Sequence, residues 1–496
     1  MRTAGGKNMA DRIRYDKKTA WQIIYNRYEG MQAKALQLLS AEVGYRVTRD
    51  PGVYTLYVLP CLKESSVLPE KCAIIIGRRE ESALLQQYIK PEEVPEDGYC
   101  IRVMKNPMDE TYRWILIAGA DDTALYYGAV DFLDHYLVQH SFYPNNNDET
   151  LDFDLPESTH ISAPKTKRRT IFTWGHPIND YRQFMRNMAR LKLNEVVLWN
   201  DFCPVNAKEI IEYAHEWGIR VIWGFAWGWS AGACRVPNLE DSYLAEVKHS
   251  VLDRFEREYA HLNVDGIYFQ SFTERGDSEV GGRSIAEAVV QLVNDTSDAL
   301  LEKYPGLDIQ FGLHATSVRN QPEVIARTDP RVEIIWEDHD AFPTCYEPDA
   351  WSSRKEGAFE GTMDFIRTIM TMRPGAKVGL LYKGYCTLDW RRFAYQSGPF
   401  LLGEAHPRLT ANDTALRYQR WKYLSGQWMQ YGASAQKMTR LIQEMDPEGN
   451  MALGMAGMFD DGIWFPEAVT SHMFWDASGT YEETMREVTA RPSVRM

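Results

Sequence analysis

The 496-residue sequence lacks most features that mark membrane, secreted or nucleic-acid-binding proteins. No apolar run approaches the roughly 18 residues of a membrane span. The basic N-terminal stretch is not followed by the apolar segment of a secretory signal. The formal net charge of −14 includes no long basic block, which argues against nucleic acid or an anionic membrane as a partner. These absences predict a cytoplasmic globular protein.

The sequence also lacks cysteine motifs and internal repeats. The seven cysteines are odd in number and contain no CxxC pair, so neither a disulfide framework nor a zinc site is indicated. No repeat of solenoid period is present. What the sequence does contain is 44% hydrophobic and 25% charged residues, the balance of an ordinary globular protein, in a chain long enough for two or three domains.

The first third of the chain indicates a small α/β domain. Apolar runs of strand character and amphipathic helical stretches follow one another. We predict helices at 19–39, 82–89 and 123–137, and strands at 54–60, 72–77, 97–104 and 114–119. A segment at 144–167, rich in Asn, Asp, Pro and Ser, is expected to link this domain to the next. The first domain with its linker is therefore placed at 1–164, and the second domain at 165–496.

The second domain shows eight β-rich apolar runs that alternate with helical stretches, as parallel βα units do. The predicted strands are 168–174, 194–200, 220–227, 266–272, 308–315, 332–338, 377–385 and 451–459. An open doubly wound sheet rarely needs eight such units, and no GxGxxG follows the first strand. The fold class we predict is α/β, a (β/α)₈ TIM barrel preceded by a small α/β domain.

Active sites of such barrels lie at the C-terminal ends of the strands. Aromatic and charged or polar residues alternate at these positions: Trp174, His176, Trp199, Asn200, Asp201, Trp227, Trp229, Gln270, Glu274, Arg275, His314, Trp336, Glu337, Asp338, Asp340, Tyr382, Lys383, Tyr385, Asp460 and Asp461. Sugar rings stack their CH faces on aromatic rings and need polar groups for their hydroxyls. The pattern indicates a carbohydrate site, although packing explains any single aromatic equally well.

Cleavage of a glycosidic bond requires a carboxylic acid and a second carboxylate opposite it. Glu274, after the fourth strand, is the predicted general acid; a surface pair with Arg275 is the alternative. After the sixth strand, Asp338 and Asp340 are the candidates for base or nucleophile. The same EDHD run also suits a metal cluster. Asp460 would bind sugar hydroxyls or cap a helix near Pro466.

These motifs resemble known glycosidases. The stretches IIIG, DGYCIRV and WILIAGADDTALYYGAVDFL in the first third are similar to the small non-catalytic domain before the barrel of family 20 β-hexosaminidases and of α-glucuronidases of families 67 and 115. GIYFQSFTERG resembles the fourth-strand segment of family 67, in which a Gly is followed eight positions later by the catalytic Glu, here Gly266 and Glu274. The resemblance implies a strand-six carboxylate that assists the water, matching Asp338 or Asp340.

The sequence departs from both families at one motif each. Family 67 has a further carboxylate after strand seven, where this sequence has Leu381 to Gly384. Family 20 has adjacent Asp and Glu residues after His-Gly-Gly, where this sequence has Phe272, Thr273 and Glu274. A β-N-acetylhexosaminidase-like enzyme and a non-catalytic carbohydrate-binding barrel therefore remain alternatives, and a metal-dependent hydrolase or isomerase is a third.

The resulting prediction is an exo-acting glycoside hydrolase on oligosaccharides, α-glucuronidase-like and needing no cofactor. Arg275, His314 and Lys383 could pair with the carboxylate of a uronic acid. Substrate contacts are predicted at Trp174, His176, Trp199, Asn200, Asp201, Trp227, Arg275, His314, Trp336, Glu337, Tyr382, Lys383 and Asp460. The tail after Trp475 is compatible with packing on the barrel or on a second copy, so a homo-oligomer stays open.

Overall fold

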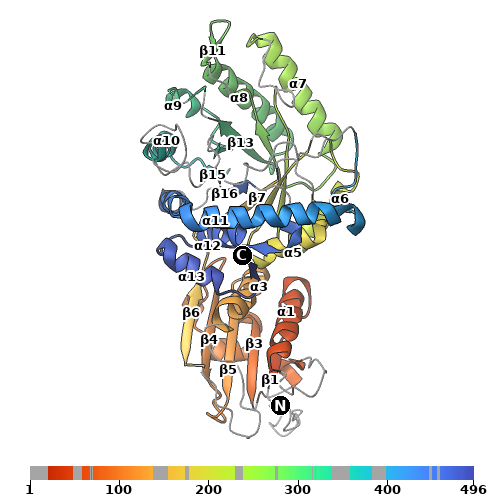
Figure 1. Ribbon diagram of the computed structural model, residues 1–496, viewed down its shortest axis with the longest axis vertical. Coiled ribbons are helices and arrows are strands. Elements are labelled where there is room, and N and C mark those ends of the chain that lie inside the picture. Colours follow the sequence, from red (N-terminus) through yellow and green to blue (C-terminus); the bar gives the residue numbers. More distant parts are fainter. Residues whose placement is uncertain are drawn as a thin grey trace, which may run out of the picture. The chain divides into compact units, whose positions relative to one another are not determined.

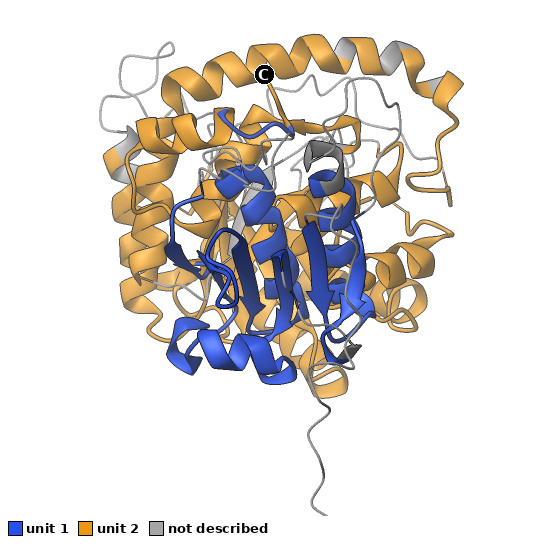
Figure 2. Ribbon diagram, turned by 90° about the horizontal axis from the view of Figure 1, so that it is seen from below, with its two compact units in different colours: residues 1–164, 490–493 blue, residues 165–489, 494–496 orange. Residues whose placement is uncertain are grey.

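The computed structural model forms two compact units, which meet in the sequence between Pro164 and Lys165; the short stretch 490–493 belongs to the first unit. Figure 2 colours the two units separately. The structure describes residues 21–47, 59–66, 69, 71–137, 155–173, 178–200, 202–228, 238–273, 277–314, 317–318, 320–337, 358–382, 398–445, 450–454 and 459–496.

The first unit is built on a six-stranded mixed sheet of order β2-β1-β3-β5-β4-β6. Neighbours among β2, β1, β3 and β5 are parallel, whereas β4 runs antiparallel to β5 and β6. Its strands are β1 (Trp21–Tyr25), β2 (Cys61–Lys63), β3 (Cys72–Arg78), β4 (Tyr99–Lys105), β5 (Arg113–Gly119) and β6 (Ser158–Ser162). Its helices are α1 (Gly30–Val47), α2 (Ala83–Tyr88) and α3 (Asp122–Asp131).

Two predictions for this unit are wrong. The segment 19–39 was expected to be one helix, but Trp21–Tyr25 is a strand between β2 and β3, and the helix begins only at Gly30, whose φ is +52°. Sheet pairing therefore overrides a helical pattern that continues across the boundary. The expected linker contains β6, which pairs with β4. The strand predicted at 54–60 lies mostly outside the described residues.

The second unit is a closed eight-stranded barrel, which confirms the predicted fold class. All eight neighbouring pairs are parallel, and Figure 1 shows the strands surrounded by helices. The barrel strands are β7 (Arg168–Phe172), β8 (Glu195–Trp199), β9 (Arg220–Gly224), β10 (Gly266–Gln270), β13 (Asp308–His314), β14 (Val332–Glu337), β15 (Val378–Tyr382) and β16 (Asn450–Gly454).

The helices that follow the strands form the outer layer of the barrel. They are α5 (Tyr181–Arg190), α6 (Ala207–Glu216), α7 (Asp241–Glu258), α8 (Ile285–Lys303), α9 (Pro322–Ile325), α10 (Ala358–Met372), α11 (Pro407–Met445), α12 (Phe465–Trp475) and α13 (Tyr481–Thr489). Two short ribbons, β11 (Glu279–Val280) with β12 (Arg283–Ser284) and β17 (Ile463–Trp464) with β18 (Val494–Arg495), complete the unit. Within the described ranges, none of the helices is both long and apolar enough for a membrane span.

Alternation along the strands sorts side chains into two apolar clusters. Outward residues such as Ile171, Leu198 and Phe269 pack under the helices in one large core. Inward residues such as Phe172, Val197 and Tyr268 form a smaller cluster inside the barrel. Because successive strand residues point to opposite sides, this sorting decides which predicted site residues reach the barrel interior.

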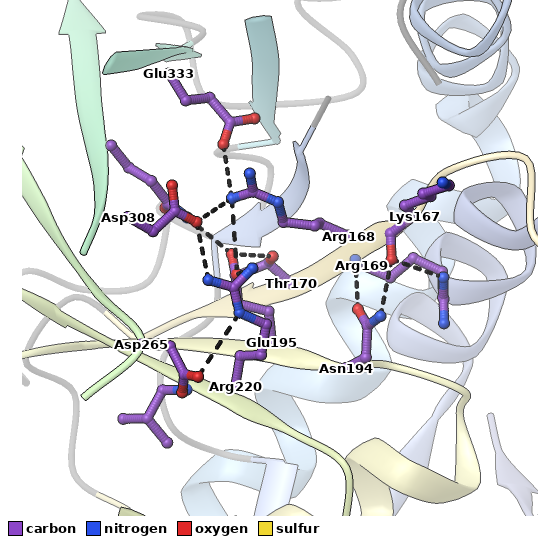
Figure 3. Close-up of polar contacts among 12 residues, drawn as sticks. Lys167, Arg168, Arg169, Thr170, Asn194, Glu195, Arg220, Asp265, Asp308 and Glu333 are labelled. Carbon is purple, nitrogen blue, oxygen red and sulfur yellow. Dashed lines mark hydrogen bonds and ion pairs between the residues drawn. The ribbon is translucent and has the colours of Figure 1, made fainter. Parts of the chain in front are cut away.

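The N-terminal end of the barrel is closed by ionic side chains, which we call the barrel floor (Figure 3): Arg168, Glu195, Arg220, Asp308 and Glu333. Arg168 pairs with Asp308 and, at 2.9 Å, with Glu333. Arg220 lies 3.0 Å from the same Asp308 carboxylate. Three carboxylates thus face two guanidinium groups. Burial, reinforced by Asp308 and Glu195, raises the pKa of Glu333 to about 8, although Arg168 opposes the shift.

This arrangement predicts a pH-dependent stability. The pKa of Glu333 in the folded state, about 8, lies above the ordinary value of 4.5, so its contribution to stability is complete below pH 4.5 and is lost as the pH rises towards 8. The loss is at most about 1.4 kcal/mol per pH unit. We expect Glu333→Gln to flatten this part of the profile, measured as the free energy of unfolding in urea. Glu302→Gln, at an exposed position of α8, should keep the parent slope; an unchanged slope in Glu333→Gln would contradict the assignment.

Candidate functional site

Three polar side chains converge on the carboxylate of Glu337 at the C-terminal ends of β10, β13 and β14. Together with it they form what we call the mouth cluster: Tyr268, Gln270, His314 and Glu337. Glu337 ends β14 and is fully buried. Its Oε1 accepts hydrogen bonds from Tyr268 Oη and, at 2.5 Å, from Gln270 Nε2. Its Oε2 lies 2.8 Å from His314 Nε2. One carboxylate therefore links three strands.

Strand register and a missing side chain create this cluster. His314 is the register partner of Glu337 on the neighbouring strand. Tyr268 and Gln270 are two residues apart on β10, so both face the barrel interior. Between β10 and β14 lies Gly312 of β13, and a Cβ there would overlap Tyr268 Oη and Glu337 Oε1. Glycine thus allows the tyrosine to reach across β13.

An aromatic wall lies in the same interior. Trp199, the last residue of β8, has its ring 6.3 Å from that of Phe172 and 6.2 Å from that of Tyr268, centroid to centroid. A Cβ at Gly224 would lie 2.6 Å from Trp199 Cε3, so this glycine makes room for the indole. Asn200, directly after Trp199, is buried. The prediction that Trp199 and Asn200 contact substrate is compatible with these positions.

The chain that leaves β10 is held on both sides. The Trp227 amide donates to the Gln270 carbonyl at 2.9 Å, and Ser271 Oγ donates to the Trp227 carbonyl at 3.1 Å. Ser317 donates to the Thr273 carbonyl through its amide at 3.3 Å and its hydroxyl at 2.5 Å. The residue after Thr273 is Glu274, the predicted acid, which lies outside the described residues.

Three predicted substrate contacts instead pack outward. Trp227 is fully buried and stacks on Phe269 with ring centroids 3.6 Å apart. Trp336 packs on Phe365 of α10 at 4.1 Å between centroids. Tyr382 Oη donates to the Ala435 carbonyl of α11 at 2.8 Å. All three belong to the core between strands and helices.

We correct these predictions because alternation allows only one of two adjacent strand residues to face the interior. The inward positions of β14 and β15 are taken by Glu337 and Leu381, so Trp336 and Tyr382 face outward. Conversely, inference from the sequence did not identify Tyr268 or Gly312. The alternation of Tyr268 with Gln270 in GIYFQ was the available signal for the first of these.

Asp460 also has a role other than the predicted one. Its Oδ2 accepts from the backbone amides of Asn179 at 2.5 Å and Asp180 at 2.8 Å, and its Oδ1 accepts from Arg417 Nη1 at 3.0 Å. Its side chain is only 3% exposed. Burial raises the pKa of Asp460 to about 6, while Arg417 opposes the shift. Asp460 therefore anchors the chain between β7 and α5. The N-cap position of the following helix is Trp464, so Asp460 does not cap that helix either.

A segment before α11 fastens two neighbouring loops. The Tyr181 amide donates to the Gly403 carbonyl at 3.2 Å, and the Val205 amide donates to the Phe400 carbonyl at 2.9 Å. The side chain of Asn206 both donates to and accepts from the backbone of Leu402, at 2.9 and 3.0 Å. The connection that follows strand seven thus reaches the loops after strands one and two.

The remaining predicted site residues stay predictions because they lie outside the described residues. They are Trp174, His176, Asp201, Glu274, Arg275, Asp338, Asp340 and Lys383. Two of them are covalent neighbours of residues whose positions are known: Glu274 follows Thr273, and Asp338 follows Glu337.

Comparison with known proteins rests on solved structures, since no family model and no curated protein matches the chain. A family 20 β-N-acetylhexosaminidase from Streptomyces coelicolor A3(2) matches with a TM-score of 0.51 and 10% identity, over 95% of this chain and 90% of that one. A substituted Streptomyces plicatus β-hexosaminidase bound to product reaches 0.49 and 9%, over 95% and 89%. A family 138 enzyme that targets pectin rhamnogalacturonan II reaches 0.49 and 12%, over 93% and 51%.

At these identities the comparison shows the fold alone, and the first structure carries that argument. The chain spans about half the length of two of the matched structures, 51% of the family 138 enzyme and 56% of a family 84 structure. Activity, substrate and partners therefore have to be argued from the site.

The anchor at Asp460 gives a test of stability. Asp460→Ala should lower the free energy of unfolding in urea by about 3 kcal/mol, because it removes the closer carboxylate from the buried Arg417 and the acceptor of two backbone amides. Asp461→Ala is the matched control: its side chain is 18% exposed and contacts the same arginine at 3.3 Å. We expect a clearly smaller loss there; equal losses in the two variants would contradict the anchoring role.

Proposed function

We propose that this chain is an exo-acting glycoside hydrolase that cleaves oligosaccharides. The observation that carries the proposal is the buried Glu337 carboxylate, held by three side chains at the C-terminal end of a closed (β/α)₈ barrel. Barrel enzymes place their chemistry at this end. The fold shared with the family 20 enzyme from Streptomyces coelicolor supports the same reading.

The proposed chemistry uses two carboxyl groups. Glu274 protonates the leaving oxygen, and Asp338 or Asp340 acts as base or nucleophile. Support comes from the chain that precedes each of them: Thr273 is held by Ser317, and Glu337 is held at the end of β14. No cofactor is needed for this reaction.

Substrate binding is proposed along the Trp199 wall. An indole offers its face to the CH groups of a sugar ring, and Trp199 is the inward aromatic at the end of β8. Asn200 and His314, with Trp174, His176, Asp201, Arg275 and Lys383, are the proposed partners of hydroxyl or carboxylate groups. The seven cysteines are scattered and odd in number, as in proteins whose thiols stay reduced, and this supports action in the cytoplasm.

Two substrate classes are in competition. A uronic acid is favoured by Arg275, His314 and Lys383, as in the resemblance to α-glucuronidases. An N-acetylhexosaminide is favoured by the likeness in fold to the family 20 β-N-acetylhexosaminidase. A non-catalytic carbohydrate-binding barrel would bind such sugars without turnover.

The test is a screen of purified protein against aryl glucuronides, aryl N-acetylglucosaminides and short uronic-acid oligosaccharides. We expect turnover of one class, and a loss of at least about a hundredfold in Glu274→Gln, which removes the general acid. Glu279→Gln, at an exposed position five residues later, is the control and should remain active.

Two outcomes would overturn the proposal. Binding of a sugar without any turnover would favour the non-catalytic barrel. Activity that disappears on treatment with a chelator and returns with a divalent ion would favour a metal-dependent enzyme built on the EDHD run.

A further inference from the structure

The two oxygens of the Glu337 carboxyl group contact two neighbouring strands. Oε1 accepts hydrogen bonds from Tyr268 and Gln270 of β10, and Oε2 lies 2.8 Å from His314 Nε2 of β13. Since Glu337 itself ends β14, this single side chain joins the ends of strands four, five and six of the barrel. Two hydrogen bonds on one oxygen and an imidazole against the other hold the Glu337 carboxyl group in one orientation.

The same carboxylate is poorly placed to react. Glu337 is fully buried, and His314 beside it is 3% exposed. Oε1 accepts from two donors, and the His314 ring lies against Oε2. A substrate ring would therefore have to displace these three side chains to reach the Glu337 carboxyl group.

The chain continues from these strand ends directly to the proposed catalytic groups. Beyond Gln270, the segment Ser271–Thr273 is hydrogen-bonded on both sides and leads to Glu274. Beyond Glu337 the next residue is Asp338. The two proposed carboxyls thus leave two strand ends that Glu337 ties together.

We propose that Glu337 is a positioning residue, which holds the ends of β10 and β14 together and so sets the spacing of the acid and its partner carboxylate. This inference rests on the proposed function. Spacing matters because carboxyls about 5 Å apart support retention and those roughly 6.5 to 9.5 Å apart support inversion. A displacement of about 1 Å can cost on the order of a hundredfold in rate.

The barrel offers a matched control for a test. Glu333 lies on the same strand, is equally buried and belongs to the barrel floor at the opposite end. Glu333→Gln and Glu337→Gln make the same nearly isosteric change at the two ends of one strand. A general effect on the stability of β14 would therefore appear in both variants, whereas an effect on positioning would appear only in Glu337→Gln.

The first measurement is steady-state kinetics on the aryl glycoside that the parent cleaves. We expect Glu337→Gln to lower kcat between about tenfold and a hundredfold with KM within about twofold, because binding persists while alignment is lost. Glu333→Gln should keep the parent kcat. The pH profile of kcat/KM in Glu337→Gln should keep both limbs, since the acid and its partner remain.

Two kinetic results would overturn the inference. An unchanged kcat in folded Glu337→Gln would show that the tie does not affect the chemistry. Loss of one limb of the pH profile would show that Glu337 is itself the acid or base. Should Glu337→Gln fail to fold, Tyr268→Phe removes one donor and keeps the carboxyl group, and the same pattern with a smaller drop in kcat is expected.

Hydrogen exchange separates failure of this inference from failure of the proposed function. The amides of Trp227 and Ser317 donate to the carbonyls of Gln270 and Thr273, so they report on the end of β10. Even if the parent cleaves no glycoside, these two amides should exchange faster in Glu337→Gln than in Glu333→Gln. Equal protection in the two variants would refute the tie between the strands.

Discussion

Closure of the barrel is the constraint on which the rest of the structure depends. Eight parallel strands closed without an edge bury the side chains that point inward, so each inward polar group needs a partner from another strand. At the N-terminal end this demand produces the floor, in which Arg168 and Arg220 face three carboxylates. At the other end it produces the mouth cluster around Glu337. The same strand, β14, contributes a buried glutamate to both.

Two glycines show how close this interior packing is. Gly224 leaves the space that the Trp199 ring occupies, and Gly312 leaves the space through which Tyr268 reaches Glu337. Neither lies in a turn, and each is the inward residue of a strand. The aromatic wall and the Glu337 carboxylate therefore fit at the same end of the barrel because the neighbouring strands β9 and β13 have glycine at these positions. Such a combination of apolar wall and oriented polar group suits a sugar ring.

Polar contacts between distant segments also hold the loops outside the strands in place. Asp460 and Arg417 hold the chain between β7 and α5, and the segment before α11 pairs with the loops after strands one and two. Contacts between segments so distant in sequence carry no local signature. The place of Asp460 after strand eight suggested that it binds a sugar hydroxyl. Its carboxylate instead accepts hydrogen bonds from two backbone amides and from the guanidinium of Arg417.

The sequence by itself determined the barrel. Each βα unit has a local pattern of apolar residues, and eight such units can be counted along the chain. It also placed His314 and Glu337 at strand ends that prove to be adjacent. Only the tertiary structure decided which neighbour faces inward, as with Glu337 over Trp336, because that choice depends on barrel register. It likewise decided that Trp21–Tyr25 is a strand, since pairing with β2 and β3 outweighs a helical pattern.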